Sequence, residues 1–255
     1  MKRFDFRIIL GILLIAGGVL AAAQSMGYLN NATDYFWGGT FALAGLAFLS
    51  MLLSGNWWAV FPGFILLGLS VMIFLPRSLE DLEGAVFLGS AAVSFWYAYF
   101  SDRERRWWAI IPGGVLTALS LLIIASSYFD EYSGAIVLGG IGFTFFVVYA
   151  TNTVERWWAI IPGGVLLTLA GMTIAATRFD GFQTSGFFFL GLSFTFLLVA
   201  LLAGMKWAYW PALALGVMGV LGIISLLNIA GYLWAVALIA AGGFIIVRFF
   251  TQRSM

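Results

Sequence analysis

Apolar residues fill this chain in long stretches, and short polar segments separate one stretch from the next. A helix needs about 20 mostly apolar residues to cross a hydrocarbon core of about 30 Å. Backbone amides in lipid must find hydrogen-bond partners within the spanning segment, so each stretch is expected to be an α-helix. The pattern predicts ten spans, at residues 7–27, 34–54, 57–76, 82–101, 107–127, 132–152, 157–177, 185–204, 207–227 and 231–250.

The expected fold class is therefore all-α, that of a polytopic integral membrane protein. A β-barrel would need strands of about ten residues with alternating polarity, and the sequence lacks that alternation. The start MKRFDFRIILGILLIAGGVLAAAQ also has the pattern of a cleaved signal peptide. The same apolar, glycine-containing pattern returns throughout the chain, which favours a retained first span.

A unit of about fifty residues recurs along the chain. The eleven residues RWWAIIPGGVL occur at 106–116 and again, unchanged, at 156–166. Four prolines recur at intervals of 50, 50 and 49, namely Pro62, Pro112, Pro162 and Pro211. The second spans of the units repeat as well, as VFLGSAAVSF (86–95), IVLGGIGFTF (136–145) and FFLGLSFTFL (188–197).

This repeat predicts a single membrane domain over 1–255, made of five tandem helical hairpins. The expected units are 1–55, 56–105, 106–155, 156–205 and 206–255. The first unit lacks the tryptophan pair and the proline, and the last has lost its acidic loop, as end caps of a stacked array do. Two spans per unit give all copies the same orientation in the membrane.

The charged residues divide unequally between the two predicted sides. The side with both termini carries ten basic residues, which are Lys2, Arg3, Arg7, Arg103, Arg105, Arg106, Arg156, Lys206, Arg248 and Arg253. It also carries four acidic residues, Asp5, Asp102, Glu104 and Glu155. The opposite side carries two basic residues, Arg77 and Arg178, against seven acidic ones, Asp34, Glu80, Asp81, Glu83, Asp130, Glu131 and Asp180. The positive-inside rule then predicts a multi-pass protein of the plasma (inner) membrane with both termini cytoplasmic.

Tryptophan and basic residues gather where the odd-numbered spans begin. A cation is attracted to anionic headgroups, and the amphipathic indole ring favours the interface just below them. A proline near the first helical turn removes an N–H that would lack a partner anyway. We therefore expect membrane-interface anchors at Trp57, Trp58, Trp107, Trp108, Trp157, Trp158, Trp207, Trp210, Arg106, Arg156 and Lys206, followed by the four helix-start prolines. A ligand cage built from the tryptophan pairs is the alternative.

Composition narrows the chemistry that the chain can carry. Hydrophobic residues make up 63% and charged residues 9%, whereas soluble domains carry about a quarter charged residues. The absence of Cys and His removes thiolate chemistry and the usual zinc and haem ligands. We expect no catalytic residue, no cofactor and no metal, although the external acidic loops leave a loose divalent-cation site open. The net charge of +1 gives no reason to expect nucleic acid as a partner.

The polar groups within the spans are mainly hydroxyls. They are expected to hydrogen-bond to their own helix or to a neighbour, or alternatively to line a narrow path for a neutral solute. Pairs of small residues four apart occur at Gly18/Ala22, Ala85/Gly89, Gly114/Ala118, Ala135/Gly139, Ala212/Gly216 and Ala237/Ala241. A chain with 31 glycines contains several such pairs by chance, so only Ala85/Gly89 and Ala135/Gly139, which match at the fifty-residue period, predict helix packing.

The stretches RIILGILLIAGGVL (7–20) and NWWAVFPGFILLGLSVMIF (56–74) resemble the short apolar hairpins of the bacterial LiaI/LiaF-like membrane family. The resemblance implies transmembrane hairpins linked to cell-envelope stress responses, and it transfers no functional residue.

The function expected from the sequence is non-enzymatic. A structural or accessory membrane module would pack with membrane lipids, with a larger membrane complex or with further copies of itself. The alternative is a channel or carrier for a neutral or lipid-like solute.

Overall fold

The computed structural model describes residues 6–28, 32–178, 184–226, 238–239 and 242, and regular structure over these residues is helical. The chain divides into two compact units, Met1–Thr151 and Asn152–Met255. Helices occupy nine of the ten predicted span positions, with ends that differ from the predicted ones by a few residues. The tenth predicted span, 231–250, falls almost entirely outside the described residues.

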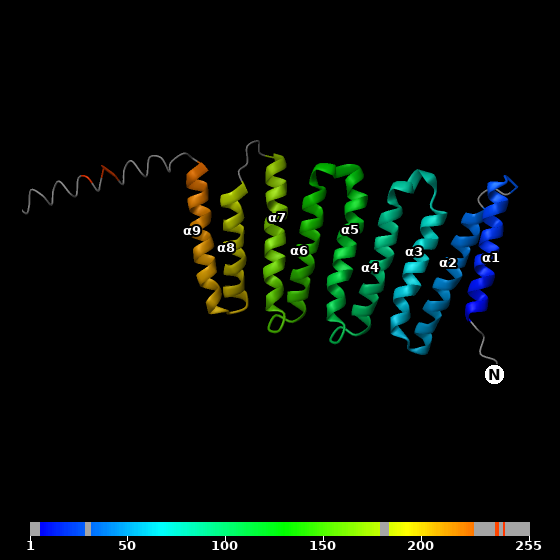
Figure 1. Cartoon of the computed structure of the whole chain (residues 1–255). Coiled ribbons are helices and arrows are strands. Elements are labelled where there is room, and N and C mark those ends of the chain that lie inside the picture. The colour runs from blue at the N-terminus through cyan, green and yellow to red at the C-terminus, as the bar shows by residue number, and fades with distance from the viewer. Residues whose placement is uncertain (1–5, 29–31, 179–183, 227–237, 240–241, 243–255) are drawn as a thin grey trace, which may run out of the picture. The chain divides into compact units, whose positions relative to one another are not determined.

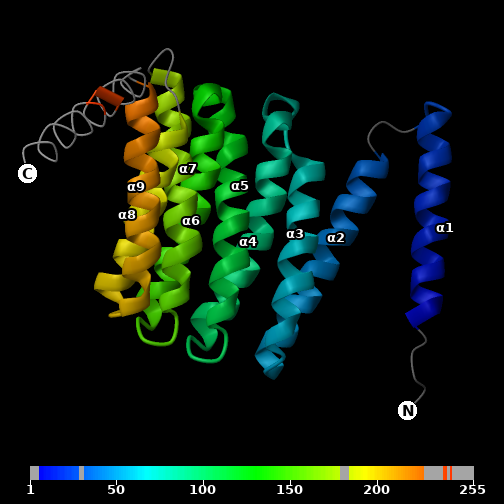
Figure 2. The same cartoon turned by 60° about the vertical axis from the view of Figure 1, so that its left-hand side comes forward.

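The first unit is a row of helices that run alternately up and down in chain order (Figure 1). Its α-helices are α1 (Phe6–Ser25), α2 (Ala32–Ser50), α3 (Val60–Phe74), α4 (Glu83–Ser101), α5 (Ile110–Phe129) and α6 (Ser133–Thr151). Short 3₁₀ segments precede or follow them: η1 (Met51–Ser54), η2 (Trp57–Ala59), η3 (Arg77–Leu82), η4 (Trp107–Ala109) and η5 (Asp130–Tyr132). Each helix packs mainly on the one before it and the one after it, so the row is one helix deep, and Figure 2 shows its helices from a second direction.

The second unit is also built of consecutive helices. It contains η6 (Trp157–Ala159), α7 (Ile160–Arg178), α8 (Thr184–Leu202), η7 (Lys206–Ala208) and α9 (Tyr209–Leu226). Within it, α8 packs against α7 on one side and α9 on the other.

Six helical segments in the described residues are long and apolar enough to cross a membrane. They are Ala32–Ser54, Trp57–Phe74, Trp107–Ser126, Asp130–Thr151, Trp157–Arg178 and Lys206–Ile224. Shorter apolar helical stretches lie at Leu14–Ser25 and Gly186–Leu202. These helices indicate a polytopic membrane protein.

The packing reverses the size distribution of a soluble protein. Most buried apolar residues are alanines, such as Ala92, Ala98 and Ala109, whereas large side chains such as Leu43, Phe143 and Phe194 are exposed. In lipid there is no hydrophobic force between helices, so small residues gather at the contacts, where they let backbones approach closely. Large apolar side chains then face the acyl chains. The observed distribution is the one expected when the solvent is a bilayer.

Within each hairpin, a glycine on one helix receives a side chain from the other. A Cβ atom on Gly164 of α7 would lie 2.5 Å from the Oγ1 atom of Thr195 on α8, and Gly114 of α5 faces Thr144 of α6 in the same way. The two glycines are 50 residues apart and the two threonines 51. Any side chain at either glycine would push the two helices apart.

The two helices of a hairpin also meet at a second crossing, and which of the two helices carries the glycine there differs from one hairpin to another. The first helix of the hairpin carries the glycine in one case, and the second helix carries it in two others. The pairs are Gly68 with Ser90, Ala118 with Gly140, and Thr168 with Gly191. The combined size at the crossing is therefore kept small while the individual residues vary.

Serine hydroxyls link neighbouring helices through backbone carbonyls. Ser70 of α3 donates to the Gly38 carbonyl at 2.8 Å, and Ser120 of α5 donates to the Ala85 carbonyl at 2.8 Å. Ser193 of α8 donates to the Ala212 carbonyl at 2.6 Å. Threonines bond back to their own helices, as Thr144 does to Gly140 at 2.9 Å. The predicted packing role of the hydroxyls is confirmed for these residues.

The predicted small-residue contact is confirmed at Ala85 and Gly89. The carbonyl of Ala85 accepts the Ser120 hydroxyl, and Gly89 lies against the same side chain. At Gly18, by contrast, a Cβ atom would meet open space, because α1 turns Gly17 toward α2, where a Cβ would lie 2.6 Å from the Trp37 ring. Gly18 itself therefore makes no close contact with another helix among the described residues.

Candidate membrane-interface turns

Four helices begin with the same short 3₁₀ turn. The turns η2, η4, η6 and η7 each end in an alanine, and each passes directly into an α-helix. The alanine N–H donates to the carbonyl three residues back, with N–O distances of 3.0–3.1 Å at Ala59, Ala109, Ala159 and Ala208. The fifty-residue repeat of the sequence is thus matched by a recurrent local backbone.

The loops that lead into η4 and η6 also share one construction. The side-chain oxygen of Asp102 accepts the Arg105 N–H at 3.2 Å, and that of Asn152 accepts the Glu155 N–H at 3.0 Å. Asp and Asn favour such turns because their short side chains can accept hydrogen bonds from the following backbone. Each loop has five residues, 102–106 and 152–156, and ends in an arginine at the start of the turn.

Each turn combines a buried alanine with a partly exposed tryptophan. The four alanines are fully buried. The rings of Trp57, Trp58, Trp108 and Trp207 are 38–47% exposed, and Trp210, on the first turn of α9, is 75% exposed. Trp107, Trp157 and Trp158 are half-buried. An indole ring with one side against protein and one side free suits the membrane interface, where its N–H can reach water.

The four prolines occupy the third residue of the helix that follows each turn. Pro62, Pro112, Pro162 and Pro211 lie in α3, α5, α7 and α9 respectively. Proline is tolerated in the first turn of a helix because the N–H groups there have no i−4 carbonyl within the helix. The proline therefore fixes where each helix begins at little cost.

Arg106 links two successive turns of the first unit. Its guanidinium carbon lies 4.0 Å from the centroid of the Trp57 ring, and its Nη1 atom donates to Ser101 Oγ at 2.5 Å. The aromatic face is electron-rich, so a cation above it is stabilised by about 0.5–1 kcal/mol at an exposed site. In the other unit, Arg156 is only 8% exposed, while Lys206 is exposed.

Aromatic rings continue the contact between turns. In the first unit, Phe61 of α3 lies 5.0 Å from Phe95 of α4, and Phe95 lies 6.3 Å from Trp108, as measured between ring centroids. In the second unit the Trp157 and Trp207 rings meet directly, with centroids 6.2 Å apart. Successive turns are thus neighbours in space within each unit, and their rings form a continuous apolar edge.

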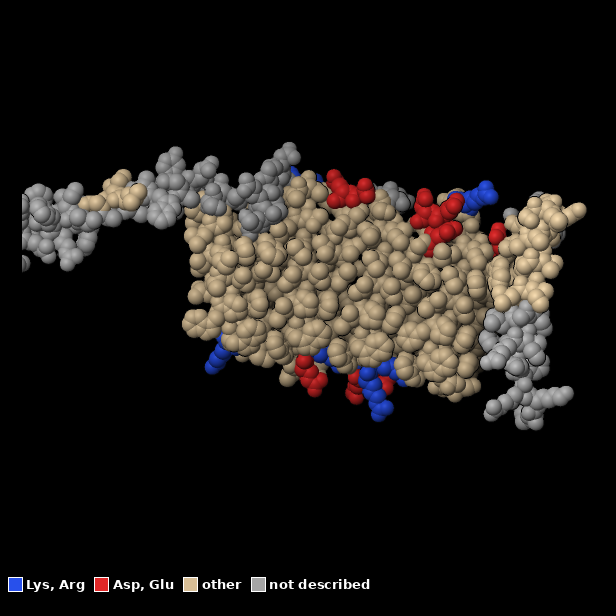
Figure 3. Space-filling model, in the orientation of Figure 1, with Lys and Arg blue, Asp and Glu red and all other residues tan. Residues whose placement is uncertain are grey.

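Charged side chains lie at the helix ends of each unit (Figure 3). In the first unit, the loop 102–106 lies at the same end as the turns and contains Arg103, Arg105 and Arg106. The opposite ends of these helices carry Glu80, Asp81, Glu83, Asp130 and Glu131, with Arg77 beside them. In the second unit, Lys206 lies at the turn end of its helices and Arg178 at the other end. The predicted Lys2, Arg3, Asp5, Asp180, Arg248 and Arg253 lie outside the described residues.

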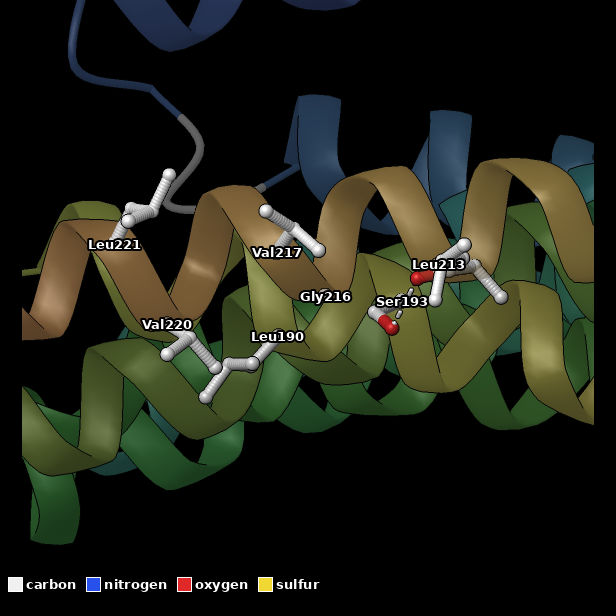
Figure 4. A pocket seen from close by; sticks show the side chains of 8 residues that line it. Leu190, Ser193, Leu213, Gly216, Val217, Val220 and Leu221 are labelled. Carbon is white, nitrogen blue, oxygen red and sulfur yellow. Dashed lines mark hydrogen bonds between the residues drawn. The ribbon is translucent and has the colours of Figure 1, made fainter. Parts of the chain in front are cut away.

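Apolar grooves open between described helices of each unit. One, of about 210 Å³ in the first unit, is lined by residues of α4, α5 and α6, including Trp96, Thr117 and Phe143. The Trp96 Nε1–H donates to Thr117 Oγ1 at 3.0 Å, and that hydroxyl donates to the Gly113 carbonyl at 2.7 Å, so its polar lining is already hydrogen-bonded. The other groove, between α8 and α9 (Figure 4), measures about 430 Å³.

Two contacts, one at the turns and one between the helices, could not be predicted from the sequence pattern. The stack of Arg106 on Trp57 joins residues 49 apart, and no local spacing indicates it. The exchange of glycine between helices at the second crossing was also missed. Its signal is present in the repeat alignment, where positions 68, 118 and 168 vary in size against positions 90, 140 and 191.

No family model matches the chain, and neither a curated protein nor a solved structure matches it. Among the described residues, no group of three or more Asp and Glu side chains is arranged to hold a metal ion.

Proposed function

We propose that this chain is a non-enzymatic structural or accessory module of a bacterial plasma membrane, which packs with lipids and with other membrane proteins. The observation that carries the proposal is the one-helix-deep row of the first unit, whose contacts use small residues and leave large apolar side chains uncovered. A helix that packs only on its chain neighbours keeps two free faces, which in a bilayer are available to acyl chains or to helices of a partner.

The proposed topology has ten spans in five tandem hairpins, with both chain ends in the cytoplasm. Support comes from the recurrent turns at 57–59, 107–109, 157–159 and 206–208 and from the basic loop 102–106 at the turn end of its helices. Basic residues favour the cytoplasmic side because they resist translocation. The tryptophan turns would then lie at the cytoplasmic interface. The resemblance to LiaI/LiaF-like hairpins is consistent with a role in the cell envelope.

A catalytic or transport role would need polar groups free to act within the helices. The described hydroxyls that could serve, such as Thr117, Ser120 and Thr144, instead hydrogen-bond to backbone carbonyls. Ionisable residues in the described helices lie at their ends. Both observations favour a packing role over a carrier for a neutral solute.

The decisive experiment extracts the tagged chain from its native membrane in polymer-bounded lipid discs and identifies the bound proteins and lipids by mass spectrometry. We expect enrichment of specific membrane proteins or lipid classes over discs formed around an unrelated multi-span protein. The variant Phe143→Ala, which removes a 66% exposed side chain from a free face of α6, should weaken this enrichment. Ser126→Ala at a helix end serves as the matched control, because its hydroxyl bonds only locally, to Ile123 at 2.8 Å.

The carrier alternative has its own measurement. The purified chain would be reconstituted in liposomes and tested for release of neutral solutes. Release above that of protein-free liposomes, together with discs that contain no enriched partner or lipid, would replace the accessory function with transport.

A further inference from the structure

The repeat explains why one face of α9 is exposed at the groove between α8 and α9. Figure 4 shows it lined by Leu190 and Ser193 of α8 and by apolar residues of α9. The side chains of Leu213 and Val217 are 63% and 53% exposed, and Val220 and Leu221 beside them are also exposed. An uncovered apolar strip of this kind is ordinary in lipid, so exposure alone identifies no occupant.

The register of α9 relative to the earlier helices identifies which face is uncovered. Pro112, Pro162 and Pro211 are equivalent, so Gly219 of α9 corresponds to Ser120 of α5. Ser120 contacts the preceding helix at Ala85, and Gly219 likewise contacts the preceding helix at Leu190. The two helices therefore present equivalent faces to the helix before them.

The face turned to the following helix can be assigned by the same register. In α5 it contains Gly114 and Ala118, which meet Thr144 and Gly140 of α6; in α7 the equivalent Gly164 and Thr168 meet residues of α8. The equivalent positions in α9 are Leu213 and Val217. The uncovered strip of α9 is thus the face that carries the second helix of the hairpin in the two preceding repeats.

The chain after α9 contains a segment that shares one motif position with the second helices of the earlier hairpins. In the second helices, the contacting glycine is followed three residues later by phenylalanine and then threonine, at Gly140-x-x-Phe143-Thr144 and Gly191-x-x-Phe194-Thr195. In the segment 231–250 the phenylalanine recurs as Phe244, fifty residues after Phe194, with Ala241 in place of the glycine and Ile245 in place of the threonine. Its placement lies outside the described residues.

We propose that the segment 231–250 of this chain occupies the α9 side of this groove, with Ala241 against Val217 and Ile245 against Leu213. The inference rests on the proposed five-hairpin organisation. At the Val217–Ala241 crossing the pair is larger than the glycine-containing pairs of earlier hairpins, so this last hairpin is more widely spaced. The occupant is a segment of the same chain, which would close the row with a helix in the orientation of α8.

Disulfide cross-linking tests this packing directly, because the natural chain has no cysteine. The double variant Val217→Cys/Ala241→Cys in native membranes should form an intramolecular disulfide on mild oxidation, seen as a shift in gel mobility that reduction abolishes. The pair Ser193→Cys/Gly216→Cys is the positive control, since a Cβ on Gly216 would lie 3.8 Å from the Ser193 Cβ, a separation that a disulfide can span. The pair Val217→Cys/Ile239→Cys is the matched negative control, because two residues along a helix turn the side chain about 200° away.

Three results would overturn the proposal. The first is no cross-link between positions 217 and 241 while the positive control cross-links. The second is equal cross-linking of position 217 to positions 239 and 241. The third is a disulfide-linked dimer of the single variant Val217→Cys, which would assign the groove to a second copy. None of these results would change the partners and lipids recovered in native discs, so the proposed function stands or fails separately.

Discussion

The guanidinium group of Arg106 lies over the indole ring of Trp57, with 4.0 Å between the guanidinium carbon and the ring centroid. The residue that precedes one turn thus covers the first residue of the turn before it. A cation on an aromatic ring gains more as water is removed, and the membrane interface removes part of it. The contact therefore ties two successive turns together, independently of the contacts between their helices.

The first prediction concerns this stack. Arg106→Ala and Trp57→Leu should each destabilise the protein, and a double-mutant cycle should give a coupling free energy of about 0.5–1 kcal/mol. The measurement is thermal unfolding in lipid discs, followed by circular dichroism. Arg105→Ala is the control, because this exposed arginine lies in the same loop and should show no coupling to Trp57. A coupling free energy of zero for Arg106 would show that the stack contributes nothing to stability.

The second prediction concerns the glycine exchange at the helix crossings. Gly68→Ser should be destabilising by about 1–3 kcal/mol, because the new side chain would overlap Ser90. Adding Ser90→Gly transfers the glycine to the other helix, as Ala118 and Gly140 already do, and should recover most of the loss. Unfolding midpoints of the natural chain and of the two variants measure this directly.

The matched control for that exchange is Gly39→Ser in α2, where a Cβ atom would meet nothing within 4 Å. It should be neutral or slightly stabilising, since replacing a helical glycine reduces the freedom of the unfolded chain. If the swapped double variant is no more stable than Gly68→Ser alone, size complementarity does not determine the crossing.

The third prediction concerns the interhelical hydroxyls. Ser120→Ala removes the 2.8 Å hydrogen bond to the Ala85 carbonyl, yet it should cost only about 0.6 kcal/mol, the average for such bonds between membrane helices. The equivalent position in α7 is already an alanine, Ala170, which is 5% exposed. An alanine therefore fits this buried position of the helix. Thermal unfolding of Ser120→Ala beside Ser126→Ala measures the difference. Loss of the folded state would mean that Ser120 has a role beyond packing.

Hydrophobic segment length predicted the helices well, but it could not predict which faces meet. Helices such as α6 are apolar on all sides, so no stripe of polarity marks the face toward a neighbour. Small-residue spacing repeated at the fifty-residue period located the contact at Ala85 and Gly89, whereas spacing alone does not distinguish Gly17, which contacts α2, from Gly18, which does not. The contact depends on the partner, here Trp37, and a partner is a property of the fold. The repeat succeeded at the turns because it compares equivalent positions across hairpins.

The fourth prediction concerns the two ends of α4, which separates the acidic η3 segment from the basic loop 102–106. Ser78→Cys and Arg105→Cys are both at exposed positions, and each introduces the only thiol of the chain. In intact cells a membrane-impermeant maleimide should label the Ser78→Cys variant and leave the Arg105→Cys variant unlabelled, because basic loops stay in the cytoplasm. Both should react after the membrane is opened with detergent, which controls for thiol reactivity. Labelling of both variants in intact cells would mean that α4 does not cross the bilayer, and labelling of Arg105→Cys alone would invert the proposed orientation.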